Sequence, residues 1–302
     1  MATAKEEVVD ITLEDRQLKK SVDVKVIGDK LYQSISLSKP DRYRSVYGGL
    51  VMSQALMAAT KSVSTLHEDF LLHSVHCYFV GPTQTDPPVN YKVGHAKDGK
   101  NFCSLSVKAM QGDKINFHCM ASFYKPISSV IEYQGHEMPS VPKPGEPTHG
   151  TQYTHFDLSL MYPIRYTHVL MDIIICARED IAKEAIAGNK HPPRVAAWIR
   201  GKGTFNSSDP QNYHRIAIVY ASDMLLARLV LNMYPGLPID LVTSLDHSVW
   251  FHCPVAAQHW YLYVAEVERA MDGRSLTTCR VYAEDGSMVA TCKQESLIRP
   301  KL

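Results

Sequence analysis

The chain has 302 residues, of which 45% are hydrophobic and 21% charged, and its 32 basic and 31 acidic side chains leave a formal net charge of +1. This length suffices for two modest domains or for one fused pair. This near-equal number of basic and acidic side chains argues against a dedicated nucleic-acid binder, which needs a basic stripe to neutralise phosphates.

Three further features favour a soluble intracellular protein. The first residues, 1–7, lack the apolar core of a secretory signal, and no apolar run approaches the roughly 20 residues that span a bilayer. The seven cysteines form an odd set without a C-x-x-C pair, which favours reduced thiols over a disulfide framework or a zinc site.

The first third of the chain predicts one helix followed by an antiparallel meander. The helix begins at Gly48-Gly49, and its small and apolar residues up to Ala59 predict burial on most of its surface. Four strand-like runs follow, separated by Gly-Pro, Asp-Gly and Gly-Asp turn signals. These runs cover residues 72–80, 89–96, 102–110 and 115–124.

The middle of the chain changes character. Four prolines and three glycines between Ile127 and Gly150 predict a linker or a surface-tracking loop. Residues from about 156 to 188 are expected to be helical in part, because 177–187 is rich in helix formers.

The last third predicts the same order of elements again. A strand at 196–200 precedes a helix from Ile216 to Leu231 and strands at 246–252, 260–267, 276–283 and 289–298. Short motifs recur at a constant spacing of 174 residues. The matching pairs are His73-Ser74-Val75 with His247-Ser248-Val249, Asp98-Gly99 with Asp272-Gly273, Gly112 with Gly286, and Lys125-Pro126 with Arg299-Pro300.

This duplication predicts an α+β double hotdog, in which two helix-wrapped antiparallel sheets fuse into a pseudo-dimer and hide their edge strands. We assign residues 1–126 to an N-terminal hotdog, 127–150 to the linker, and 151–302 to a C-terminal hotdog with a helical insertion at its start. Fusion already pairs the two hotdog units within one chain, so the sequence leaves open whether several chains form a larger homo-oligomer.

Comparison of the two copies indicates candidate polar residues. At the 174-residue spacing Asp223 aligns with Gly49, Ser244 with Phe70, and Gln294 with Met120. Each has a plainer interpretation: Asp223 as the N-cap of the second helix, Ser244 as a turn hydroxyl, and Gln294 as an exposed strand residue.

Other chemistry has little support in the sequence. There is no nucleophile elbow, phosphate loop or dinucleotide-binding motif. Four histidines lie on predicted strands without metal-ligand spacing, and we expect them to be structural: His73, His76, His247 and His252. We therefore predict neither a metal nor a cofactor.

Several motifs resemble the acyl-CoA thioesterase II family, and the peroxisomal members most of all. The similarity covers nearly the whole chain. The motifs that carry it are Leu245-Asp246-His247-Ser248-Val249-Trp250-Phe251-His252, Tyr220-Ala221-Ser222-Asp223, Gln294-Glu295 with Ile298-Arg299, Tyr47-Gly48-Gly49, Gln54-Ala55-Leu56, His73-Ser74-Val75-His76-Cys77-Tyr78-Phe79 and Ala121-Ser122-Phe123.

The resemblance implies a double hotdog that hydrolyses acyl-CoA to free acid and coenzyme A. The family's catalytic aspartate, hydroxyl residue and glutamine fall on Asp223, Ser244 and Gln294. Asp223 would act as a general base on a water held by the other two. Backbone amides at a helix N-terminus would stabilise the oxyanion.

This chain departs from the family pattern at two places in the first copy. The family usually has glutamine after the paired glycines, where Leu50 stands, and arginine where Leu105 stands. Both departures put in doubt what the first copy contributes to substrate binding.

The last three residues, Pro300-Lys301-Leu302, resemble the Ser-Lys-Leu peroxisomal address, with proline in the first place. We expect this ending to bind a peroxisomal import receptor. If it does not bind, we expect the protein to be cytoplasmic.

Two rival functions stay open on the sequence alone. One is a non-catalytic acyl-CoA-binding protein that kept the fold. The other, an enoyl-CoA hydratase, is less favoured because no histidine stands beside Asp223 in the sequence.

Overall fold

The computed structural model describes residues 18–39, 44–144, 153–155, 170–178, 194–203, 205–234 and 236–301. Three helices and one 3-10 helix have the bounds α1 Leu18–Ser21, α2 Gly48–Ser64, α5 Gln211–Ser222 and η3 Leu229–Met233. The strands of the first half are β1 Val24–Gly28, β2 Leu31–Ser34, β3 Leu71–Phe79, β4 Asn90–Asp98, β5 Phe102–Gln111 and β6 Lys114–Tyr124. The later strands are β7 Tyr153–His155, β8 Met171–Arg178, β9 Arg194–Gly201, β10 Ile239–Ser244, β11 Asp246–Phe251, β12 Tyr261–Met271, β13 Arg274–Ala283 and β14 Met288–Pro300.

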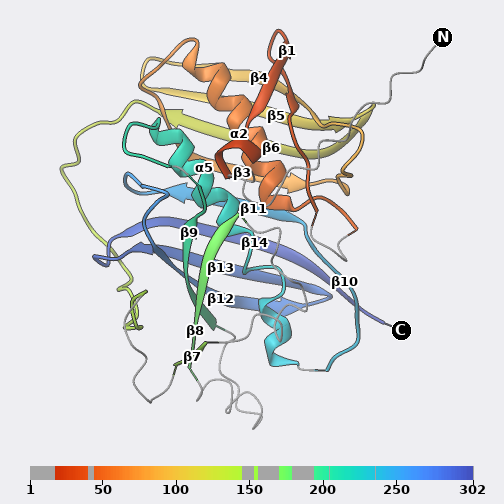
Figure 1. Ribbon diagram of the computed structural model, residues 1–302, viewed down its shortest axis with the longest axis vertical. Coiled ribbons are helices and arrows are strands. Elements are labelled where there is room, and N and C mark those ends of the chain that lie inside the picture. Colours follow the sequence, from red (N-terminus) through yellow and green to blue (C-terminus); the bar gives the residue numbers. More distant parts are fainter. Residues whose placement is uncertain are drawn as a thin grey trace.

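The described strands form one continuous antiparallel sheet (Figure 1). Its order is β1-β2-β4-β5-β6-β3-β11-β14-β13-β12-β9-β8-β7, with β10 pairing beside β14. The two halves join where β3 lies antiparallel to β11, with Val249 opposite Val75. This central pairing removes one exposed edge from each half.

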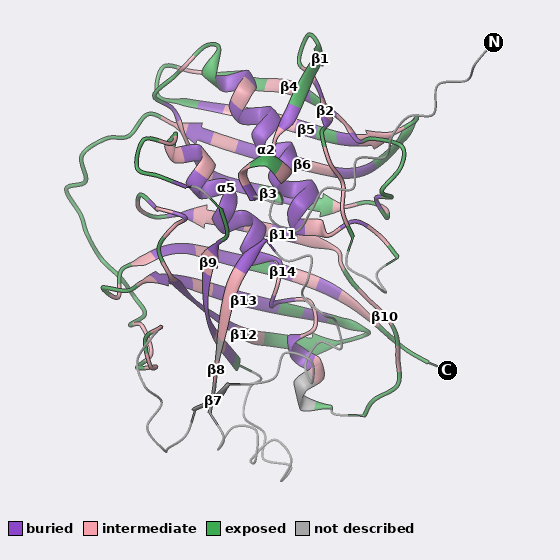
Figure 2. Ribbon diagram, in the orientation of Figure 1, coloured by how far each residue is buried: buried purple, intermediate pink, exposed green. Residues whose placement is uncertain are grey.

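Helices α2 and α5 pack against each other near the middle of this sheet (Figure 1). Every residue of α2 from Gly49 to Thr60 is buried, which explains its small and apolar composition. Figure 2 shows that the buried residues follow the two helices and the strand faces around them. The arrangement confirms the double hotdog that the duplication predicts.

Helix α5 does not lie where the sequence pattern places it. The predicted helix runs from Ile216 to Leu231, whereas α5 begins at Gln211 and ends at Ser222. Pro210 stands at its N-cap with an extended ψ of 137°, where the missing N–H of proline is harmless. After Ser222 the chain turns through Leu225 and Leu226 and forms η3 from Leu229.

Polar residues in the first turns of α5 bind the backbone at and just before the start of β3, in the other half. The Asn212 side chain accepts a hydrogen bond from Leu72 N at 2.8 Å and donates to Phe70 O at 3.0 Å. Arg215, only 1% exposed, donates to Leu72 O. These buried polar residues fix α5 against β3, and their polarity hid the start of the helix from the sequence pattern.

The constant spacing of 174 residues holds for most strands but fails at the last one. Gln294 pairs with Thr277 on β13, and Phe123 pairs with Cys103 on β5. Thr277 and Cys103 keep the 174-residue spacing, whereas Gln294 and Phe123 are 171 apart. The counterpart of Gln294 is therefore Phe123, and the predicted alignment with Met120 is wrong because the last hairpin is three residues shorter.

Over its described part the expected linker is exposed from 127 to 137 and packs on the sheet beyond that point. The Pro142 carbonyl accepts a hydrogen bond from Trp198 Nε1 at 2.8 Å, and Met138 and Val141 pack on a second apolar cluster around Trp198. Residues 145–150 lie outside the described residues.

The segment that we expect to be helical in part is described only between 170 and 178. Residues 171–178 form strand β8, which pairs with β9 and so extends the sheet. Of the residues rich in helix formers, 177 and 178 end this strand, and 179–187 lie outside the described residues. Among the helices that are described, none is both long and apolar enough to cross a bilayer.

Candidate active site

Asp223 ends helix α5 and does not begin it. Its φ of −78° and ψ of −6° place it at the C-cap, so the interpretation of Asp223 as the N-cap of its own helix is wrong. The residue is 8% exposed, and its carboxylate faces the other half of the molecule. Asp223 Oδ2 accepts a hydrogen bond from Gly49 N at 2.9 Å, in the first turn of α2.

The side chain therefore caps a helix that belongs to the other copy. The N-cap residue of α2, Tyr47, supplies no side-chain capping bond, and the positive end of this helix favours a nearby carboxylate. Asp223 and Gly49 stand 174 residues apart. In space they are contact partners and not equivalent positions.

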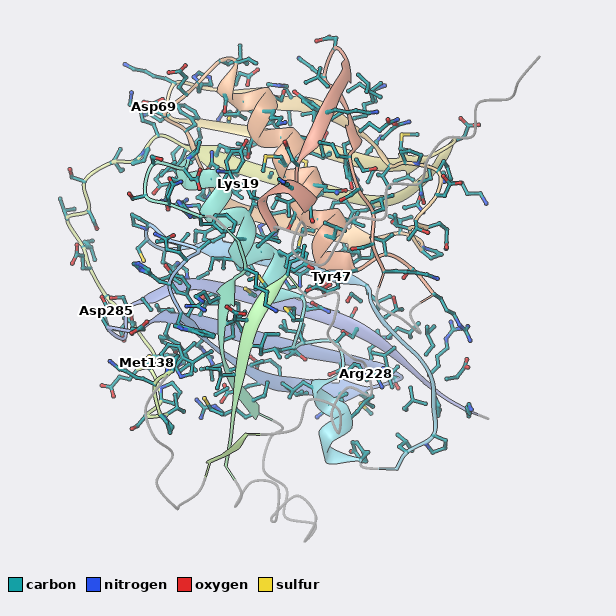
Figure 3. All side chains as sticks on the ribbon, in the orientation of Figure 1. Lys19, Tyr47, Asp69, Met138, Arg228 and Asp285 are labelled. Atoms are coloured by element: carbon teal, nitrogen blue, oxygen red, sulfur yellow. The ribbon has the colours of Figure 1, made fainter. Side chains whose placement is uncertain are left out.

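The paired glycines permit this contact. A Cβ on Gly49 would lie 2.6 Å from the Tyr220 carbonyl oxygen, and a Cβ on Gly48 would lie 2.8 Å from Asp223 Oδ2. Tyr47, labelled in Figure 3, fixes the same junction, because its hydroxyl donates to Tyr220 O at 2.7 Å. Only glycine lets the two helix ends approach this closely.

Ser244 and Gln294 lie beside the carboxylate. Ser244 Oγ donates to Asp223 Oδ1 at 3.3 Å and accepts from Gln294 Nε2 at 2.6 Å. Ser244 ends β10 one residue before β11 begins, and both of these strands pair with β14, which carries Gln294. The three residues indicated by the sequence therefore lie within one hydrogen-bonded group.

The plainer interpretations of these two residues fit less well. Gln294 is 0% exposed, so it is not a surface residue of its strand. Ser244 is half-buried and lies at the end of a strand, with both of its hydrogen bonds inside the group.

Burial controls the acidity of Asp223. It raises the pKa of the carboxyl to about 7, and the hydrogen bonds from Gly49, Ser244 and Gln294 oppose this rise. A carboxyl that titrates near neutral pH can exchange a proton under physiological conditions, as a general base must.

His247 belongs to the same group, although the sequence pattern indicated a structural residue. It is 0% exposed. Its Nδ1 lies 2.5 Å from Gln294 Oε1, and its Nε2 lies 2.8 Å from Ser222 Oγ. Burial lowers the pKa of the imidazole to about 4, so the ring is neutral at pH 7. A buried histidine leaves no sign of these contacts in its spacing along the chain.

The first copy has apolar residues at the corresponding places. Phe70 and Phe123, the counterparts of Ser244 and Gln294, are 2% and 0% exposed. Leu50 and Leu105, which depart from the family pattern, are both buried in the main core. This half therefore contributes apolar packing and the N-terminus of α2.

A groove of about 460 Å³ lies elsewhere, on the C-terminal half. Among its lining residues, Arg200 pairs with Asp172 and covers the Trp260 ring. None of the residues in the Asp223 group lines it.

The chain matches two family models and several characterised proteins. A model of the acyl-CoA thioesterase N-terminal domain matches residues 39–124, and one of the acyl-CoA thioesterase C-terminal domain matches residues 146–298. Acyl-coenzyme A thioesterase 8 of Homo sapiens is 34% identical over 271 residues, which cover 85% of this chain and 82% of that protein.

Two further relatives extend the comparison. Peroxisomal acyl-coenzyme A thioester hydrolase 1 of Saccharomyces cerevisiae is 23% identical over 311 residues, covering 84% of this chain and 86% of that protein. The crystal structure of an acyl-CoA thioesterase II, TesB2, from Mycobacterium marinum superposes with a TM-score of 0.73 at 24% identity. That similarity covers 94% of this chain and 97% of the other, and it supports the fold.

Replacing Gly49 with alanine should destabilise the protein, because the new methyl group would overlap the Tyr220 carbonyl and the Tyr47 ring. Overpacking of this kind costs about 1–3 kcal/mol, measurable by urea unfolding. Gly81→Ala is the matched control, since no heavy atom lies within 4 Å of the place that its Cβ would take. Equal unfolding free energies for the two variants would contradict the proposed close approach.

Proposed function

The chain belongs to the acyl-CoA thioesterase family and is a thioester hydrolase, and from this premise we propose that Asp223, Ser244 and Gln294 form its catalytic site. The site would cleave acyl-CoA to a free fatty acid and coenzyme A. The observation that carries this proposal is the buried Asp223 carboxylate, held by Gly49 N–H and joined to Gln294 through Ser244.

Asp223 serves as the general base. Its pKa of about 7 leaves a substantial ionised fraction at neutral pH and makes the carboxylate more basic than an exposed one. Ser244 and Gln294 hold the attacking water beside it, which converts an encounter with solvent into a positioned reaction.

The first turn of α2 would stabilise the thioester as it reacts. The positive end of the helix suits the negative charge that develops on the thioester carbonyl oxygen. Gly49 N donates to Asp223, and Leu50 N and Val51 N donate to Tyr47 O, so we assign the oxyanion to the Gly48 amide.

The bonds and protons balance without a covalent enzyme intermediate. Water attacks the carbonyl carbon as Asp223 takes up one of its protons. The tetrahedral intermediate then collapses, the carbon–sulfur bond breaks, and the thiolate of coenzyme A leaves. Transfer of the proton from Asp223 to this thiolate restores the carboxylate.

The first copy supplies no equivalent group, since Phe70 and Phe123 cannot hold a water. A hydratase is also less favoured, because it needs a histidine that faces the substrate. Both ring nitrogens of His247 are already bonded to Gln294 and Ser222.

We expect Asp223→Asn to reduce kcat by about 10²–10⁴-fold, the usual contribution of a general base, while acyl-CoA still binds. Thiol release measured with a thiol reagent gives turnover, and calorimetry with a non-hydrolysable thioether analogue gives binding. Asp69→Asn is the control, because Asp69 pairs with Lys125 at the surface, far from the site (Figure 3).

If the kcat of Asp223→Asn stays within threefold of that of the unmodified protein, Asp223 is not the general base. A pure acyl-CoA-binding protein would release no thiol even before mutation. A hydratase would instead convert an enoyl-CoA to its hydroxyacyl-CoA without releasing thiol.

We also propose a peroxisomal location, supported by the Pro300-Lys301-Leu302 ending and by the yeast relative named as peroxisomal. Lys301 is exposed, and its N–H donates to Pro238 O at 2.9 Å. Leu302 lies outside the described residues.

A fluorescent protein fused to the N-terminus should colocalise with a peroxisomal marker, and deletion of Leu302 should make it diffuse. A diffuse signal from the full chain would contradict this proposal, as would a peroxisomal signal that survives the deletion.

A further inference from the structure

We propose that His247 is a positioning residue, which fixes the direction of the Gln294 amide and thereby directs the Ser244 hydroxyl proton toward Asp223. This inference rests on the proposed function, because the direction of that proton matters only if Asp223 and Ser244 hold the attacking water.

The orientation of the Gln294 amide in the structure fixes which atoms donate and which accept. Gln294 Nε2 donates to Ser244 Oγ, and Ser244 donates to Asp223. The other amide atom, Gln294 Oε1, can only accept, so His247 Nδ1 must carry the proton of the neutral ring. His247 Nε2 is then bare, and it accepts from the Ser222 hydroxyl.

The Ser222 hydroxyl is the group at which the donor-to-acceptor direction of this series of hydrogen bonds could reverse. Its single hydroxyl proton has two acceptors at 2.8 Å, His247 Nε2 and the Val219 carbonyl. If the proton went to Val219, His247 Nε2 would have to donate and Nδ1 to accept. The Gln294 amide would then have to turn over, and the Ser244 proton would point at Gln294.

The choice of ring nitrogen therefore decides whether Asp223 receives the Ser244 hydrogen bond. In the assigned direction each donor in the chain points toward the carboxylate, and aligned hydrogen bonds of this kind strengthen one another. Because Ser222 and Asp223 are consecutive residues, the series of hydrogen bonds from Ser222 through His247, Gln294 and Ser244 ends at the neighbour of the residue where it began. This closed arrangement holds the side chains in fixed positions.

The first copy shows why only one histidine can act in this way. His73 is the counterpart of His247, but a β-bulge lies between Leu72 and Ser74 on β3. His73 bonds Ser122 Oγ at 2.8 Å and packs on Phe102 and Tyr124, which are not part of the core. His247 lies on β11 and is fully buried, with its ring nitrogens bonded to Gln294 and Ser222.

Two substitutions separate the two ring nitrogens. His247→Asn keeps a donor near the Nδ1 position and loses the group at Nε2. His247→Gln reaches the Nε2 position and loses the donor that faces Gln294. We expect kcat to fall by about fivefold or less in His247→Asn and by about 100-fold in His247→Gln, the size of a lost preorganised donor, with KM unchanged in both.

His252→Asn is the matched control, since His252 bonds Thr291 on the exposed surface. Equal kcat values for His247→Asn and His247→Gln would overturn the proposal, whether both stay active or both are impaired. Changes confined to KM would also overturn it.

Nitrogen NMR of the unmodified protein tests the same point without relying on a variant that folds. The His247 ring should be neutral with its proton on Nδ1 from pH 6 to 8, and a proton on Nε2 or on both nitrogens would overturn the proposal. This result is independent of turnover. Full activity in Asp223→Asn would instead refute the proposed function and leave the state of the His247 ring unaffected.

Discussion

The hydrogen bond from Gly49 N to Asp223 is the contact on which the organisation of this protein depends. It joins the start of α2 to the end of α5, and so joins the two copies of the hotdog. It needs glycine on one side, because a side chain at Gly49 would strike the Tyr220 carbonyl. It also needs a buried carboxylate on the other side, and burial gives that carboxyl a pKa of about 7. The same contact therefore joins the two copies and holds the carboxyl that we propose as the general base.

The two copies share a fold but differ in the side chains and contacts at the site. His73 is half-buried and bonds Ser122, whereas His247 is fully buried and bonds Gln294 and Ser222. The segment between α5 and β11 adds β10, which places Ser244 beside the carboxylate. The first copy has phenylalanines at the matching positions. One half thus provides the polar group, and the other provides the helix terminus that it binds.

Much of the fold could be predicted from the sequence, because turn signals and alternating strands repeat in both copies. Strand β8 was not predicted, since a short apolar run such as Ile173 to Ile175 fits a buried strand and a buried helix equally well. The start of α5 was missed because Asn212 and Arg215 are polar yet buried. The contact between Asp223 and Gly49 was out of reach, because a constant spacing marks equivalent positions and cannot reveal which residues touch. His247 was missed for a related reason: its role depends on neighbours from three separate segments.

The pH dependence of kcat/KM tests the central claim most directly. If the buried Asp223 must be ionised to accept a proton from water, log kcat/KM should rise with a slope of about one per pH unit below about 7 and reach a plateau above it. The acid limb follows from the raised pKa, since a protonated carboxyl cannot act as a base. A kcat/KM that stays constant from pH 5 to pH 7 would show that no group with this acidity controls catalysis, and it would contradict the account.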